Sequence, residues 1–293
     1  MDRPKTENEE FNDMQSQRYD KFQPELEIYN PEKLKEEPTS RQINVISLMS
    51  AGPRKSENLE TELGEDVIGF FSMKDATYFW VLDGTSDSAG IILQDGTHCF
   101  SSRVLAQVLG YQILISLEKN KGNLQNILEN SIAETIDILT KLVQGTNRDL
   151  KDKINETIIN VGPLAISTTI LFGKFSNNGN LEILNLGDSD CLTFQIYNES
   201  NLKHIEFFKI EPNNRLFFIL YQAEEQFHIR TNKYEEKIST QSISSVDSIV
   251  AFSDGVNTSK SALKTRPEYA LKVISAIDQR SFDDKSLIWL KRS

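Results

Sequence analysis

The stretch YFWVLDG, residues Tyr78–Gly84, decides how the chain is interpreted, because its apolar run ends abruptly in an acidic residue and a glycine. The pattern predicts a buried strand that delivers one carboxylate to the rim of a sheet, with the glycine letting the backbone turn and expose its carbonyl. A second copy lies far downstream, where Ser248–Phe252 runs into Ser253-Asp254-Gly255. Asp-Gly is also an ordinary turn dipeptide. Two apolar strands that end alike are nevertheless most simply explained if Asp83 and Asp254 meet at one site.

Length and composition indicate a soluble protein. The chain has 293 residues, of which 38% are hydrophobic and 26% charged, enough for one large domain or two small ones. Its net charge of -11 argues against a nucleic-acid partner, which needs clustered Lys and Arg. No apolar run is long enough to cross a membrane, and the first residues lack the apolar core of a signal peptide. We therefore expect a cytoplasmic protein with no membrane partner.

The first 42 residues differ from the rest of the chain. Pro4, Pro24, Pro31 and Pro38 fall here among Glu, Lys, Gln and Asn, and apolar residues are sparse. The composition predicts a mobile acidic tail over residues 1–42, followed by one domain over residues 43–293. Docking of a partner through apolar residues of this tail is the alternative to a solvated arm.

The domain alternates strand and helix patterns. A hairpin formed by Val67–Phe71 and the central stretch predicts Asp66 and Asp83 at the same sheet edge. Three-four apolar spacing predicts helices at Ser101–Asn120 and Leu124–Val143. The other expected elements are strands at Leu164–Phe172, Leu181–Leu186, Ile205–Lys209, Arg215–Tyr221, Lys237–Ser242 and Leu287–Leu290, and a helix at Arg266–Gln279. This order predicts an α+β layered domain.

Four carboxylates stand at predicted strand ends, namely Asp66, Asp83, Asp254 and Asp283. Hard divalent cations such as Mg²⁺ and Mn²⁺ prefer oxygen ligands and keep several waters. A few aspartates and one backbone carbonyl therefore suffice for a pair of ions, which can activate water and neutralise a phosphoryl group.

In this set of motifs the sequence resembles the metal-dependent serine/threonine protein phosphatases of type 2C, over about residues 43–291. Val81-Leu82-Asp83-Gly84 resembles the start of the family's Asp-Gly-His-Gly-Gly signature, and Ser253-Asp254-Gly255 its Ser-Asp-Gly motif. The remaining matches, in chain order, are Asp66 in Gly-Glu-Asp-Val, Ser167-Thr168-Thr169, Leu186-Gly187-Asp188-Ser189, and Asp283-Asp284-Lys285-Ser286-Leu287. Six matches in the right order carry the assignment.

The resemblance implies a four-layer α-β-β-α sandwich, in which two central antiparallel β-sheets are flanked by helix pairs. It also implies a binuclear Mn²⁺ or Mg²⁺ site between the sheets. The metal ligands carried over are Asp66, Asp83, the Gly84 carbonyl, Asp254 and Asp283, with Asp83 and Asp66 as the catalytic pair.

The sequence departs from the family in three places. Thr85-Ser86-Asp87 replaces His-Gly-Gly, which removes a histidine often proposed as the general acid. Asp190 stands where the family usually has arginine, and the short separation of Asp254 from Asp283 predicts a trimmed or missing flap.

Several assignments stay open at this level. Arg54 or Lys55 supplies a phosphate-binding cation or is a solvated loop charge. Asp188 caps a turn through Ser189 or serves a third metal. Glu62 and Glu65 compete with Asp66 for the early ligand position, because loop register cannot be fixed from one sequence.

The leading hypothesis is a phosphatase that hydrolyses phosphoserine or phosphothreonine in phosphoprotein substrates by direct attack of metal-activated water. The alternative is a pseudophosphatase that keeps the fold as a binding or regulatory module, as the altered Asp-Gly-Thr-Ser loop indicates. A structural partner acting through residues 1–42 is a third possibility.

Overall fold

The computed structural model describes residues 42–50, 64–85, 91–92, 98–119, 122–198, 201–206, 214–259 and 284–293. Contacts within the chain divide it into two units, Met1–Thr39 and Ser40–Ser293, and every described residue belongs to the second. The predicted tail over residues 1–42 therefore lies almost entirely outside the described residues, and its boundary stays a prediction. None of the described helices is both long enough and apolar enough to cross a membrane.

The first of two large antiparallel sheets contains the stretch that ends in Asp83. Its strand order is β13-β8-β7-β3-β2. The strands are β2 (Val67–Ser72), β3 (Ala76–Leu82), β7 (Ile170–Ser176), β8 (Leu181–Leu186) and β13 (Ser239–Ile243). All seven residues of β3 are buried, as the apolar run predicts. Because Val67 pairs with Leu82, Asp66 and Asp83 lie at the same edge, which confirms the predicted hairpin geometry.

The second large sheet carries the other Asp-Gly strand. Its order is β1-β15-β14-β9-β10, and all of its pairings are antiparallel. The strands are β1 (Ile43–Ser50), β9 (Asp190–Asn198), β10 (Asn201–Glu206), β14 (Ser248–Phe252) and β15 (Lys285–Arg292). The strand β14 lies between β15 and β9 and is buried throughout, so both Asp-Gly strands are interior strands of their sheets.

A third, smaller sheet has the order β12-β11-β6, from β6 (Leu164–Thr168), β11 (Leu216–Ala223) and β12 (Gln226–Thr231). The prediction of one strand over Leu164–Phe172 is wrong in this respect, because the chain changes sheets at Thr169, between β6 and β7. The backbone N–H of Thr169 donates to the carbonyl of Asp83, and its hydroxyl bonds that of Ser189. The first bond holds Thr169 at the end of β3, and the second holds it beside the turn between β8 and β9. A separate two-stranded ribbon consists of β4 (Ile91–Ile92) and β5 (His98–Phe100).

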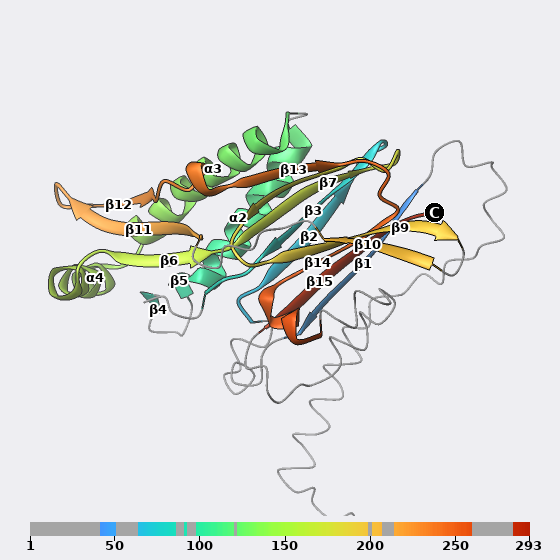
Figure 1. Cartoon of the computed structure of the whole chain (residues 1–293). Coiled ribbons are helices and arrows are strands. Elements are labelled where there is room, and N and C mark those ends of the chain that lie inside the picture. Colours follow the sequence, from blue (N-terminus) through green and yellow to red (C-terminus); the bar gives the residue numbers. More distant parts are fainter. Residues whose placement is uncertain are drawn as a thin grey trace, which may run out of the picture. The chain divides into compact units, whose positions relative to one another are not determined.

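Three α-helices are described. The helices α2 (Ser102–Lys119) and α3 (Leu124–Gln144) confirm the two predicted helices and lie together against the first large sheet (Figure 1). The helix α4 (Arg148–Val161), which the sequence reading missed, begins at Asn147, whose side chain accepts from the N–H of Leu150. Two short 3₁₀ segments, η2 (Glu235–Lys237) and η3 (Asp254–Ser259), complete the elements. The predicted helix at Arg266–Gln279 lies outside the described residues.

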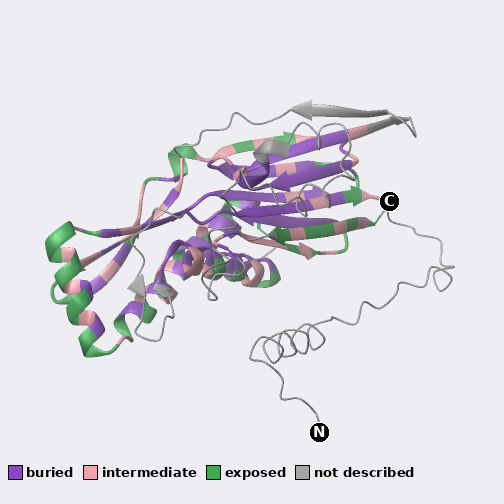
Figure 2. Ribbon diagram, turned by 90° about the horizontal axis from the view of Figure 1, so that it is seen from below, coloured by how far each residue is buried: buried purple, intermediate pink, exposed green. Residues whose placement is uncertain are grey.

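The apolar core is layered in the way the elements imply. One cluster fills the space between the helices and the first and third sheets. A second lies between the two large sheets, with Phe79 and Val81 from β3 facing residues such as Ile249 and Ala251 from β14. Figure 2 shows the strands of both large sheets as mostly buried, whereas α4 carries exposed residues along its length. The predicted α+β fold with two central antiparallel sheets is therefore confirmed, with α2 and α3 as one of the two predicted helix pairs, and the described residues do not include the second pair.

Candidate metal centre

Three strand ends bring three aspartates together. Asp83 follows β3, Asp188 follows β8 after Gly187, and Asp254 follows β14 after Ser253. One carboxylate oxygen from each lies within 4.8 Å of the other two. Asp83 is buried and the other two are half-buried. The strands come from both large sheets, so the group lies where the ends of the two sheets meet.

The position of Asp83 is fixed by its own backbone. Its carbonyl accepts from the N–H of Thr169 at 2.9 Å and from the hydroxyl of Thr168 at 3.0 Å. Two hydrogen bonds to one buried carbonyl hold the end of β3 against the start of β7. The carboxylate of Asp83 is therefore presented from a rigid strand end rather than from a free loop.

Gly84 is required by close packing. A Cβ at this position would lie 2.8 Å from the carbonyl oxygen of Glu65, a separation that real Cβ atoms do not adopt. Gly84 also forms an isolated antiparallel bridge with Thr168, made by the bonds of the residues on either side of it. The bridge leaves the Gly84 carbonyl unused, so its predicted role as a metal ligand stays a prediction.

Asp66 lies beside Asp83 but outside the group of three. It is buried, and its side chain is within hydrogen-bonding distance of that of Asp83. Burial raises the pKa of Asp66 from 3.8 to about 7, a hydrogen bond from Ser253 opposes this shift, and the nearby charge of Asp284 adds to it. A carboxyl in such surroundings is costly to ionise unless a cation is near.

Asp284 anchors the loop that carries Asp66. Its side chain is buried and accepts from the backbone N–H of Glu65. Gly64, at φ +69°, lies directly against the same carboxylate, where any Cβ would overlap it. The loop entering β2 is thus tied to the beginning of β15, which is separated from it by more than 200 residues.

Asp188, whose role as a turn cap or a metal ligand the sequence left open, lies in the group of three aspartates. The hydroxyl of Ser189 bonds that of Thr169 at 2.9 Å. The Oδ1 atom of Asp188 is buried and has no hydrogen-bond partner within the described part of the chain. The sequence reading left the role of Asp188 open, and a Gly-Asp-Ser turn gives no local signal that separates the two roles.

Two predicted site residues fall in segments that the structure does not describe. Asp283, the predicted late ligand, and Arg54, the predicted phosphate-binding residue, both lie outside the described residues, as do the alternatives Lys55 and Glu62. Glu65, the other alternative for the early ligand, is described and uses its backbone N–H to bind Asp284.

The departures from the phosphatase pattern are visible in the structure. The hydroxyl of Thr85, which stands at the position of the family's histidine, lies 2.7 Å from the hydroxyl of Ser167. Asp190 is buried and accepts from the N–H of Cys191 at 2.7 Å. Both side chains therefore have local structural partners.

The donor set fits a hard divalent cation. All members of the group offer carboxylate oxygens, which Mg²⁺ and Mn²⁺ prefer over nitrogen or sulfur. Asp188 and Asp66 each keep a buried oxygen without a hydrogen-bond partner in the described residues. Like charges within 4.8 Å repel by roughly 3 kcal/mol per pair in a partly buried setting. A bound cation would relieve this repulsion and complete both oxygens.

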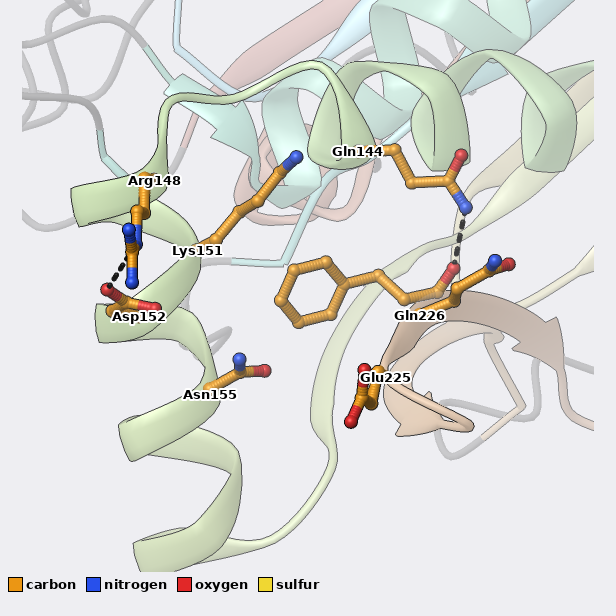
Figure 3. Close-up of a pocket in the computed structure, with 8 residues that line it drawn as sticks. Gln144, Arg148, Lys151, Asp152, Asn155, Glu225 and Gln226 are labelled. Carbon is orange, nitrogen blue, oxygen red and sulfur yellow. Dashed lines mark hydrogen bonds and ion pairs between the residues drawn. The ribbon is translucent and has the colours of Figure 1, made fainter.

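The polar cavity on the described surface lies elsewhere. It has a volume of about 510 Å³ and lies between α4, the end of α3 and the β11–β12 hairpin (Figure 3). Its lining mixes Arg148 and Lys151 with Asp152, Glu225 and three amide side chains. None of the clustered aspartates lines it, so this cavity is separate from the candidate centre.

Comparison with known proteins establishes the fold. No protein-family model and no curated protein matches the chain. A bacterial serine phosphatase carrying a single substitution aligns with 86% of this chain and 99% of its own, at 13% identity and a TM-score of 0.50. RsbX in complex with magnesium aligns at 9% identity over 86% and 100% of the two chains, with a TM-score of 0.49. The serine/threonine phosphatase Stp1 from Staphylococcus aureus aligns at 14% identity over 85% and 95%, with a TM-score of 0.48.

At 13% identity, the first likeness shows a shared fold and says nothing of activity. The resemblance to type 2C phosphatases is confirmed at this level: the chain has the fold of these phosphatases and carries three acidic residues that could hold a metal ion.

Proposed function

We propose that this chain is a cytoplasmic metal-dependent phosphatase that hydrolyses phosphoserine or phosphothreonine in protein substrates. The observation that carries the proposal is the convergence of Asp83, Asp188 and Asp254 from separate strand ends on a fold that serine phosphatases use. One carboxylate oxygen from each of the three lies within 4.8 Å of the other two, an arrangement of like charges that is costly without a compensating cation. A cation explains the arrangement.

The proposed metal ligands come from both large sheets and from the loop that enters β2. Asp83, Asp188 and Asp254 would hold one Mn²⁺ or Mg²⁺, and Asp66, the Gly84 carbonyl and Asp283 would complete the site for a second. When bound, the ions would neutralise the phosphoryl oxygens and activate water for in-line attack. Asp83 is held by Thr168 and Thr169, and Asp66 is held through the loop anchored by Asp284. The chain thus keeps its ligands in place before substrate arrives, which reduces the cost of reorganisation.

A second function has one specific observation in its favour. Thr85 occupies the position of the family's histidine, and its hydroxyl is bonded to Ser167. A site that holds metal but lacks a proton donor for the leaving group would act as a pseudophosphatase that binds phosphoproteins without rapid turnover. Docking of a partner through residues 1–42 is compatible with either function.

The deciding experiment is hydrolysis of p-nitrophenyl phosphate with Mn²⁺ by the wild type and by Asp83→Asn. We expect turnover that requires metal and falls by more than about 100-fold in the variant, because it loses a ligand shared by the whole group. Asp137→Asn, the same change on an exposed side chain of α3, is the control. Calorimetry with Mn²⁺ supplies a second readout. Mn²⁺ binding without turnover in the wild type would favour the pseudophosphatase, and absence of both would reject the metal centre.

A further inference from the structure

The third sheet has two faces of different character. Alternation along β11 directs Leu216, Phe218 and Leu220 into the core against the helices. The residues between them point the other way, together with their cross-strand partners on β12. We call this set the outer face; it consists of Phe217, Ile219, Tyr221, His228 and Arg230. Its members are half-buried except Arg230, which is exposed.

Toward β6 the outer face ends at the buried residues Ser167 and Thr85, which adjoin the candidate metal centre. Phe217 pairs directly with Ser167 on β6, so the two side chains share one side of the sheet. The hydroxyl of Ser167 lies 2.7 Å from that of Thr85, the residue that follows Asp83 and Gly84. A chain lying along the outer face would therefore run toward the aspartates.

The far part of this face carries an exposed cation on an aromatic support. The rings of Tyr221 and His228 stack with centroids 5.6 Å apart. The guanidinium of Arg230 lies 5.5 Å from the centroid of Tyr221. No carboxylate pairs with Arg230 among the residues that the structure describes. A cation held in place and left without a carboxylate partner suits a negatively charged ligand.

We propose that the outer face is the docking surface for an extended, acidic segment of the phosphoprotein substrate, with Arg230 binding an Asp or Glu side chain of that segment. This inference rests on the proposed function, since the segment is defined by its distance from the phosphoserine. Half-buried Phe217 and Ile219 would contact the segment between Arg230 and the metal centre. Glu224 and Glu225 form the turn between β11 and β12, beyond His228. Their charges disfavour acidic residues of the bound segment near this turn.

The sheet geometry sets the spacing of the acidic residue. Arg230 pairs with Ile219, two residues along β11 from Phe217, and Phe217 pairs with Ser167. Strands lie about 4.8 Å apart and rise about 3.3 Å per residue, which gives roughly 12 Å between Arg230 and Ser167. An extended peptide that also reaches Asp83 would place its acidic residue about three to five positions from the phosphoserine.

The opposite face of the same sheet supplies a matched control. Lys151 on α4 lines the cavity that Figure 3 shows, on the side of the sheet toward which the buried Phe227 points. Its ammonium has no ion-pair partner in the described residues either. Lys151→Glu therefore makes a charge reversal comparable to Arg230→Glu, at a site that is not continuous with the aspartates.

The test uses two pairs of phosphoserine peptides. In each pair, one peptide carries aspartates and the other carries lysines three to five residues from the phosphoserine. The charged residues precede the phosphoserine in one pair and follow it in the other. With full-length protein and Mn²⁺, we expect Arg230→Glu to raise KM for one acidic peptide roughly five- to ten-fold. Its effect on the lysine peptide and on p-nitrophenyl phosphate should be several-fold smaller. Lys151→Glu should leave all of these values within about two-fold of the wild type.

The outcomes separate this inference from the proposed function. Equal effects of Arg230→Glu on both peptides, or a larger effect of Lys151→Glu, would overturn the docking surface. If the wild type hydrolyses nothing, the proposed enzyme fails, and fluorescence anisotropy with a labelled acidic phosphopeptide becomes the readout. Binding weakened by Arg230→Glu alone would then still support the surface, and binding unaffected by it would reject it.

Discussion

The aspartate group and the cavity beside α4 are both polar and both contain carboxylates. Each also has a buried oxygen, on Asp188 and on Asn155, with no hydrogen-bond partner in the described residues. They differ in the balance of charge. In the cavity, Arg148 and Lys151 accompany Asp152 and Glu225, and the Arg148–Asp152 pair is largely exposed. In the aspartate group, three carboxylates face each other, and two more, Asp66 and Asp284, are buried beside them.

The balance of charge, and not the presence of a cavity, indicates where chemistry is expected in this molecule. Exposed mixed charges cost little to maintain, because water screens them. Buried charges of one sign are costly, and a fold retains them where something compensates for the cost. The cavity beside α4 is therefore the weaker candidate. Similar substitutions in the two regions test this contrast.

The largest contrast is expected between Asp188→Asn and Asp152→Asn. The first removes a charge from the group of three, so we expect the dissociation constant for Mn²⁺ to rise by at least about 100-fold. The second removes an exposed carboxylate of the cavity and should change it by less than about two-fold. Isothermal titration calorimetry measures both. Unchanged Mn²⁺ affinity in Asp188→Asn would break the contrast and return Asp188 to the role of a turn residue.

The parts of the site that could be predicted from the sequence are those with a local signal. An apolar run ending in Asp-Gly located Asp83 and Asp254, because a buried interior strand needs continuous apolar residues and a tight exit. The hairpin that places Asp66 next to Asp83 followed from the short turn between β2 and β3. These features depend on neighbours in sequence, and periodicity reports them.

The parts that could not be predicted depend on distant contacts. The chain changes sheets at Thr169 without Gly or Pro, because hydrogen bonds to Asp83 and Ser189 redirect it. The helix α4 has only Leu150 and Ile154 fully buried, so its apolar stripe is too thin to stand out. The role of Asp284 arises from a backbone N–H more than 200 residues away, which no spacing rule reveals.

The next effect concerns the pH dependence of stability. Because the pKa of Asp66 is raised from 3.8 to about 7, the folded metal-free protein binds a proton that the unfolded chain has already lost between these values. The contribution of Asp66 to the free energy of unfolding is thus fully present below about pH 4 and is lost as the pH rises through 7. We expect Asp66→Asn to be more stable than the wild type at pH 8 by on the order of 2 kcal/mol in chelator. Urea unfolding at pH 5 and pH 8 measures this.

The exposed Asp137 on α3 is the control for this pH effect, and Asp137→Asn should leave the pH dependence as in the wild type. If the free energy of unfolding of the wild type did not fall between pH 5 and pH 8, ionisation of Asp66 would not destabilise the metal-free protein. The contrast with the exposed cavity charges would then lose its basis.

A smaller effect is expected from the anchor of the Asp66 loop. Asp284→Ala removes the acceptor for the Glu65 N–H and should weaken Mn²⁺ binding by about ten-fold and destabilise the protein by about 1 to 2 kcal/mol. Asp284→Asn retains an acceptor oxygen and should recover most of the Mn²⁺ affinity. The two variants, compared by calorimetry and thermal unfolding, separate positioning from charge. Equal Mn²⁺ affinity in Asp284→Ala and the wild type would reject the positioning role.

The smallest effect is expected in the cavity. Asn155→Leu removes a buried oxygen that has no hydrogen-bond partner in the described residues and places a better helix former in α4. We expect a gain of less than about 1 kcal/mol in thermal unfolding, with Mn²⁺ affinity and phosphatase activity unchanged. Asp188 also has a buried oxygen with no hydrogen-bond partner in the described residues, yet Asp188→Asn should weaken Mn²⁺ binding by at least about 100-fold. Asn155→Leu could instead impair turnover as strongly as Asp188→Asn. The excess of like charge at the aspartates would then not be what distinguishes the functional site from the cavity.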